Sequence, residues 1–212
     1  MPQIKTTTKH DCLLIVDMQN DFMPGGPLAV TGGDEIVPII NRMMCYFDCV
    51  VCTQDWHPPN HISFAATHPG YQPFESTQLA YGRQTLWPVH CVAGSEGAAL
   101  HSSLDLRPIN LIVRKGYRPS VDSYSAFYEA DRVTATGLEG YLHTRQIRRV
   151  VCVGLATDYC VAFSALDARA AGFSVALVSE ACRAIDLEGS LTEAMRNMNA
   201  AGIQQLSINA FA

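Results

Sequence analysis

The stretch VGLATDYCVAFSALDARAAG, residues 153–172, joins a short apolar run to an alanine-rich segment of helix-forming composition. This order predicts a buried strand followed by a helix, with Gly172 in the usual C-terminal capping position. Asp158 is a suitable N-cap, which would place Cys160 in the first helical turn. A thiol at this point is either a small core residue or a nucleophile. The rest of the sequence has to decide between the two.

Similar apolar, β-branched runs recur along the chain, and helical segments fall between them. The runs are nearly continuous, as in strands that are buried on both faces of a parallel sheet. They are CLLIV (12–16), CVVCT (49–53), LIV (111–113), VVCVGL (150–155), SVALVS (174–179) and IQQLSI (203–208). Helices are expected at residues 34–46, 138–145, 158–171 and 188–201. The alternation predicts a three-layer α/β fold around a parallel sheet, in a single domain over residues 1–212.

Composition excludes several classes of function. The chain of 212 residues is 48% hydrophobic and 17% charged, which is typical of one globular domain with a full core. Its net charge of −5 gives no basic footprint, so nucleic acid is not an expected partner. The first apolar run is interrupted at Asp17 and is too short for a signal peptide or a membrane span. We therefore expect no membrane association and a cytoplasmic location.

Eight cysteines raise the question of disulfides or structural zinc. Cys12, Cys52 and Cys152 lie inside the strand-like runs, and no export signal precedes them, which favours buried, reduced thiols. Cys45, Cys49 and Cys52 could suggest a zinc knuckle. No matching pair lies elsewhere in the sequence, so we favour core positions for them.

Three reactive side chains follow three of the predicted strands. Asp17 follows the first, Lys115 follows the third, and Cys160 follows the fourth. Each alone would be a cap, a solvated strand end or a core residue. Together at one edge of a parallel sheet they supply a nucleophile, a base and a cation. The amide groups of the helix N-terminus would stabilise a thiolate and an oxyanion, which are the requirements of acyl transfer.

A second group of polar residues lies in residues 54–108, an irregular insertion rich in proline and histidine. Asp55 and His57 are two residues apart at a strand end, so in extended backbone their side chains point the same way. His90 could join them, and this set suits zinc, iron or manganese. His61 and Cys91 are alternative ligands that spacing does not exclude.

These motifs resemble the nicotinamidases of the isochorismatase-like cysteine hydrolase superfamily. The resemblance covers most of the chain. It rests on LLIVDMQNDFMPGGPLAV (13–30), TQDWHPPNHISFA (53–65), LWPVHCVAGSEGA (86–98), VRKGYRPSVDSYSAF (113–127) and VGLATDYCVAFSALDA (153–168). It implies a six-stranded, mostly parallel sheet flanked by helices. It also implies hydrolysis of nicotinamide to nicotinate and ammonia in NAD salvage, with pyrazinamide as a further substrate.

The resemblance also assigns roles to individual residues. It implies a catalytic triad, one divalent metal ion, with zinc favoured over iron or manganese, an oxyanion hole and aromatic walls around the pyridine ring. It further implies a cis peptide bond before Ala156. The triad would be Asp17, Lys115 and Cys160; the metal ligands Asp55, His57 and His90; the oxyanion donors Ala156 and Cys160; the aromatic residues Phe22, Trp87 and Tyr124.

Other functions are disfavoured by particular residues. Isochorismatases lack the cysteine nucleophile, and N-carbamoyl amidases generally lack this metal set. An inactive scaffold protein would not need Asp17, Lys115 and Cys160 together, and a metal-binding protein would not need Asp17 or Lys115. The sequence is compatible with a homo-oligomer but does not specify one.

Overall fold

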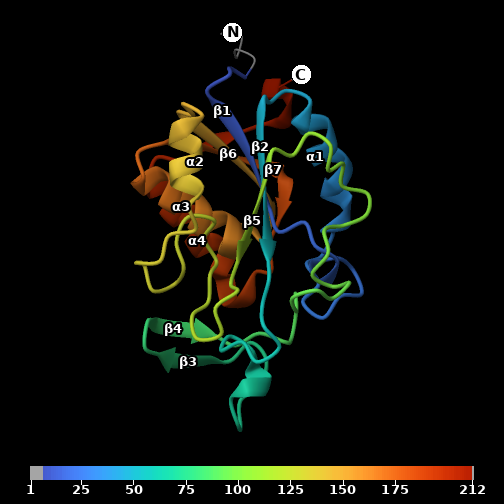
Figure 1. Cartoon of the computed structure of the whole chain (residues 1–212), viewed down its shortest axis with the longest axis vertical. Coiled ribbons are helices and arrows are strands. Elements are labelled where there is room, and N and C mark those ends of the chain that lie inside the picture. Colours follow the sequence, from blue (N-terminus) through green and yellow to red (C-terminus); the bar gives the residue numbers. More distant parts are fainter. Residues whose placement is uncertain (1–6, 212) are drawn as a thin grey trace.

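A six-stranded parallel sheet forms the centre of the computed structural model, which describes residues 7–211 (Figure 1). The strand order is β5-β2-β1-β6-β7-β8, and every neighbouring pair is parallel. All six expected strands are confirmed, with β2, β5 and β7 longer than predicted and β8 shorter. Their bounds are β1 (Asp11–Val16), β2 (Cys49–Asp55), β5 (Leu111–Lys115), β6 (Arg149–Leu155), β7 (Ser174–Arg183) and β8 (Gln204–Leu206).

Helices cover both faces of the sheet, which confirms the three-layer architecture. Helix α1 lies on one face, and helices α2, α3 and α4 lie on the other (Figure 1). Their bounds are α1 (Val37–Met44), α2 (Leu138–Thr144), α3 (Ala162–Ala170) and α4 (Ser190–Ala200). Short 3-10 turns occupy Asn20–Phe22, Asp34–Ile36, Ala65–Thr67, Leu187–Gly189 and Ile208–Phe211. Among the described residues, no helix combines the length and apolar character needed to cross a membrane.

An antiparallel hairpin lies inside the insertion that we expected to be irregular. Its strands are β3 (Ser76–Leu79) and β4 (Gly82–Thr85). Their sequences, STQL and GRQT, are short and polar, so these strands could not be predicted from an apolar run. The hairpin lies at the end of the molecule opposite to both termini, beyond the carboxyl ends of the parallel strands (Figure 1).

The helix after β6 begins differently from the prediction. A π-helical turn, Thr157–Val161, precedes α3, and the Val161 amide donates to the Ala156 carbonyl. Ala156 therefore occupies the N-cap position, and the expectation that Asp158 caps the helix was wrong. The carboxylate of Asp158 is instead used by the segment between β7 and α4. It accepts hydrogen bonds from the Ile185 and Asp186 amides and from the Ser190 hydroxyl.

The two central strands approach each other closely at Gly154, whose φ of +111° favours glycine. A Cβ at this position would lie 2.2 Å from the Val16 carbonyl oxygen. We expect Gly154→Ala to lower the free energy of unfolding by about 3 kcal/mol or more, because backbone cannot move aside. Gly140→Ala in α2 is the control, since a Cβ there meets nothing within 4 Å. Urea denaturation checks both variants, and equal midpoints would contradict the prediction.

Candidate active site

The three reactive residues from three strands meet at the carboxyl edge of the sheet. Asp17 directly follows β1, Lys115 is the last residue of β5, and Cys160 lies in the π-helical turn after β6. The Lys115 Nζ is 2.8 Å from Asp17 Oδ2 and 3.3 Å from Cys160 Sγ. All three side chains are buried. The structure thus brings together the group that the sequence singled out.

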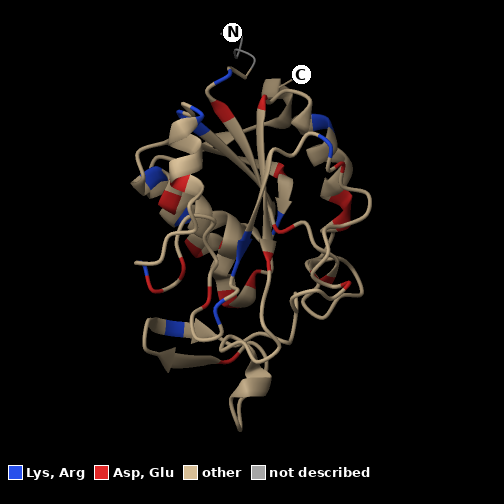
Figure 2. Cartoon of the chain, viewed as in Figure 1, with Lys and Arg blue, Asp and Glu red and all other residues tan. Residues whose placement is uncertain are grey.

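Lys115 lies at the centre of this group and has no exposed surface. Its neighbour in the sheet is Asp55, the last residue of β2, whose Oδ1 is 2.5 Å from Nζ. Nζ also donates to the Ser123 carbonyl at 3.1 Å. Burial alone would lower the pKa of Lys115, but the Asp17 and Asp55 carboxylates outweigh it and raise that pKa well above its usual value. Lys115 is therefore a cation at neutral pH. Figure 2 shows the basic end of β5 beside the acidic end of β2.

Asp17 is held rigidly but keeps one oxygen available. Its amide donates to the Thr53 hydroxyl, and that hydroxyl donates to Oδ1 at 2.6 Å. Within residues 7–211, Oδ2 is the single buried side-chain polar atom without a hydrogen bond, although it contacts Lys115 as an ion pair. Burial raises the pKa of Asp17, against the attraction of Lys115. Carboxylate oxygens of Asp17 and Asp55 and the Cys160 sulfur lie within 4.8 Å of one another. Asp17 is thus placed to accept a proton from the thiol.

The thiol of Cys160 is less readily ionised than its predicted position at a helix start suggested. Burial raises the pKa of the thiol well above its usual value, and Lys115 is the main opposing influence. The resting group is therefore the thiol, and ionisation needs a base at hand. The peptide bond between Leu155 and Ala156 is cis, as expected. The amides of Tyr159 and Val161, on either side of Cys160, both donate to the Ala156 carbonyl.

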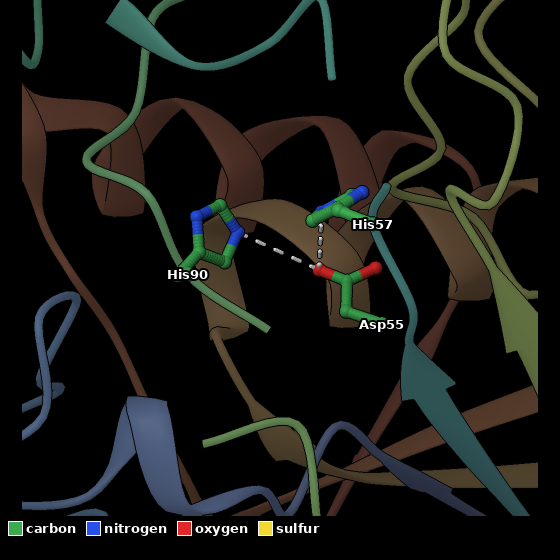
Figure 3. A group of neighbouring side chains, drawn as sticks. All are labelled: Asp55, His57 and His90. Carbon is green, nitrogen blue, oxygen red and sulfur yellow. Dashed lines mark ion pairs between the residues drawn. The ribbon is translucent and has the colours of Figure 1, made fainter. Parts of the chain in front are cut away.

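Asp55, His57 and His90 converge beside this group and form a candidate metal centre (Figure 3). Asp55 Oδ2 is 3.4 Å from Nε2 of His57 and 3.8 Å from Nε2 of His90. The Nδ1 atoms face the backbone carbonyls of Gly116 and Pro88, both at 2.8 Å. A proton on each Nδ1 leaves the Nε2 lone pairs directed at Asp55. Two imidazole nitrogens and a carboxylate oxygen fit a divalent metal ion.

The alternative ligands are placed differently. Both ring nitrogens of His61 are engaged, Nδ1 with the Ser63 hydroxyl at 2.7 Å and Nε2 with the Val121 carbonyl at 3.2 Å. The His61 ring stacks on His57 at 4.1 Å, and together with Asp122 the two histidines form a second cluster. Cys91 is buried and belongs to no candidate metal cluster within the described part of the chain.

All eight cysteines are free thiols. Cys45 is exposed, whereas Cys49 and Cys52 are buried in β2. Within residues 7–211, none of the three belongs to a candidate metal cluster. Core positions are therefore confirmed for Cys49 and Cys52, whereas the expectation of a core position for Cys45 was wrong.

A narrow pocket opens above the thiol and the candidate metal centre. Phe22, Trp87 and Tyr124 line this pocket, and Trp87 Nε1 donates to the Tyr124 hydroxyl at 2.9 Å. Four lining residues were missed by sequence reasoning: Leu28, Asp122, Tyr159 and Ile185. Leu28, Asp122 and Tyr159 lie inside the quoted motifs and could have been suspected. Ile185 follows β7 and lies outside those motifs, so the sequence did not indicate that it would line the pocket.

This fold and this group of side chains define an enzyme class, the cysteine hydrolases with a three-layer α/β/α architecture. The chain belongs to the isochorismatase family, because residues 11–210 match the Isochorismatase domain. It is 53% identical to the nicotinamidase of Acinetobacter baylyi over 208 residues, 98% of this chain and 97% of that protein.

Solved structures of similar proteins agree with this assignment. The nicotinamidase/pyrazinamidase of Acinetobacter baumanii superposes with a TM-score of 0.96 at 50% identity, covering 97% of this chain and all of that one. PnC1 from L. infantum, solved with nicotinate, gives 0.85 at 42% identity and covers 97% of both chains. The Pyrococcus horikoshii pyrazinamidase, solved with zinc, gives 0.77 at 35% identity, covering 93% of this chain and 99% of that one.

Proposed function

We propose that this protein is a nicotinamidase, an amidohydrolase that converts nicotinamide to nicotinate and ammonia in NAD salvage and also deamidates pyrazinamide. One observation carries the proposal: a buried thiol, Cys160, lies beside Lys115 and Asp17 at the base of an aromatic pocket. The similarity to nicotinamidases and pyrazinamidases supports the choice of substrate. We further propose that residues 1–212 act as one hydrolase domain.

The first half of the reaction forms a thioester. Asp17 Oδ2 takes the proton of the Cys160 thiol, and Lys115 stabilises the resulting thiolate. The sulfur attacks the amide carbon, and the amides of Ala156 and Cys160 are the proposed donors to the oxyanion. The C–N bond then breaks, and Asp17 returns its proton to the leaving nitrogen, which departs as ammonia.

The second half of the reaction releases the acid. Asp17 accepts a proton from water, which attacks the thioester carbon. The C–S bond breaks, nicotinate forms, and the proton returns to Cys160. Because Asp17 is buried and held by Thr53, one carboxylate can serve both halves without moving.

Asp55, His57 and His90 would hold one divalent metal ion, for which we propose zinc, with iron or manganese as the alternatives. A bound metal would supply a Lewis acid for the pyridine nitrogen, which would position the ring without activating the nucleophile. The pocket residues of this chain orient the ring: Phe22 and Trp87 enclose it, and Tyr124 supports Trp87. Orientation of the ring places the amide carbon at the thiol.

His57→Ala should leave less than about a tenth of the wild-type metal content, because one of three side-chain ligands is removed. His61→Ala is the control and should keep at least about half, since both of its ring nitrogens have other partners. Metal-to-protein ratios after dialysis, measured by elemental analysis, check both variants. Unchanged metal in His57→Ala would contradict the ligand set.

The direct test of the function is ammonia release from nicotinamide, with nicotinate identified as the second product. The wild-type enzyme should release one ammonia for each nicotinate. Pyrazinamide should be deamidated as well, and a chelator should suppress both reactions until metal is restored. A pure, metal-replete protein that releases no ammonia from nicotinamide would contradict the proposal.

A further inference from the structure

Gln84 is the one buried residue in the two strands of the β3–β4 hairpin. The other seven strand residues are partly or fully exposed, whereas Gln84 is 2% exposed. A buried amide side chain costs free energy unless its polar atoms are hydrogen-bonded. The hairpin lies beyond the carboxyl ends of the parallel strands (Figure 1), and its two short, mostly polar strands form no core that requires such a residue. The partners of Gln84 indicate its purpose.

The side chain of Gln84 connects the hairpin to two residues that line the pocket. Its Nε2 is within hydrogen-bonding distance of three acceptors: the Thr85 carbonyl at 2.7 Å, Asp122 Oδ2 at 2.8 Å and the Tyr124 hydroxyl at 3.0 Å. Its Oε1 accepts from the Tyr81 hydroxyl at 3.1 Å. Gln84 itself does not line the pocket, so its influence has to pass through Asp122 and Tyr124.

Tyr124 connects Gln84 to Trp87 through its hydroxyl group. The Trp87 Nε1 donates to the same hydroxyl oxygen that accepts from Gln84, so two donors fix that oxygen. The Trp87 ring also lies edge-on to Tyr159, with ring centroids 4.9 Å apart. The orientation of this aromatic wall therefore depends on a hydroxyl that Gln84 holds in place.

Gln84 also holds Asp122, a second residue of the pocket wall. Its carboxylate is 2% exposed and forms no ion pair with a lysine or arginine in the described part of the chain. Its hydrogen bonds come from the Ser123 amide and from Gln84. The amide of Gln84 thus supplies a neutral donor to a buried carboxyl group at the pocket wall.

We propose that Gln84 is a positioning residue through which the hairpin sets the shape of the substrate pocket, by holding Tyr124, Trp87 and Asp122. The inference rests on the proposed function, because it concerns binding of the aromatic amide at that same site. Gln84 contacts neither the thiol nor its base. Its loss should therefore weaken binding of the ring and leave the chemistry of Cys160 intact.

Two substitutions test this role. Gln84→Glu keeps the shape but removes the hydrogen bonds that the amide donates and places a second carboxyl group against Asp122, so KM for nicotinamide should rise about tenfold. Gln84→Met keeps the length without charge and should raise KM about fivefold. In both, kcat should stay within about threefold. Alkylation of Cys160 by iodoacetamide, followed by peptide mass spectrometry, should proceed at the wild-type rate.

Gln78 provides the matched control, because it is an exposed glutamine on the other strand of the hairpin. Gln78→Glu and Gln78→Met should leave KM and kcat unchanged. The role of Gln84 is contradicted if both of its variants keep KM within twofold, if Gln78→Glu raises KM equally, or if alkylation slows together with kcat. A wild-type enzyme without ammonia release contradicts the proposed function instead. Thermal unfolding of each variant verifies the fold, and Gln84→Met decides if Gln84→Glu does not fold.

Discussion

Cys160→Ala is expected to lower kcat by about 10⁴-fold or more, to the detection limit of an ammonia assay. The substitution removes the only atom that can form the thioester, and no other thiol lines the pocket among the described residues. Alanine fits without strain, since Cys160 lies in a helical turn. Binding of nicotinamide, measured by calorimetry, should persist because the aromatic walls and the metal ligands are untouched.

A matched control for this variant is Cys152→Ala in β6. That cysteine has the same size, is buried in the strand that leads to Cys160, and does not line the pocket. It should lose some stability through the cavity that is created, yet keep its turnover. Mass spectrometry of wild-type enzyme quenched during turnover should reveal an acyl adduct on Cys160. Residual turnover in Cys160→Ala above about 1% of wild type would rule out the covalent route.

Asp17→Asn is the second large effect, with an expected loss of about 10³-fold in kcat. The amide is isosteric but accepts no proton, so neither the thiol nor the attacking water can be deprotonated. The change also leaves Lys115 with a single carboxylate partner, Asp55. Steady-state kinetics with nicotinamide, together with the rate of Cys160 alkylation, would show both consequences: turnover and alkylation should fall together.

Asp11→Asn is the control for this variant, since Asp11 begins the strand whose end precedes Asp17. Its carboxylate pairs with Arg149 at 2.8 Å, far from the pocket along the strand. The substitution should lower the midpoint of urea unfolding slightly and leave kcat unchanged. A loss of kcat below tenfold in Asp17→Asn would mean that another group is the base.

Much of the fold was predictable because buried parallel strands leave continuous apolar runs. Each of the six runs became a strand, and the polar residues at or just after the ends of β1, β2, β5 and β6 meet at one edge. The β3–β4 hairpin was not predictable, because its strands are short and polar and pair only with each other. Asp158 was misassigned because a carboxylate near a helix start is usually a cap, whereas here it binds the segment after β7.

The site was predictable to a similar extent. The residue types and their strand-end positions indicated which side chains would gather. They could not indicate that Asp55 faces Lys115 with one oxygen and two histidines with the other. Nor could they indicate the partners of Gln84, because those bonds join residues 38 and 40 positions apart across irregular segments.

Strand β5, which ends in Lys115, lies at the edge of the sheet and is hydrogen-bonded on one side only, to β2. Ile112 on this strand is 43% exposed, and Arg114 stacks over Trp56 at the surface. Edge strands open locally at a lower free energy than central ones. The amides of β5 should therefore exchange with deuterium faster than those of β1. Mild denaturant should abolish turnover before the rest of the molecule unfolds. When β5 separates from β2, the ammonium group of Lys115 loses its contacts with Asp17 and Asp55.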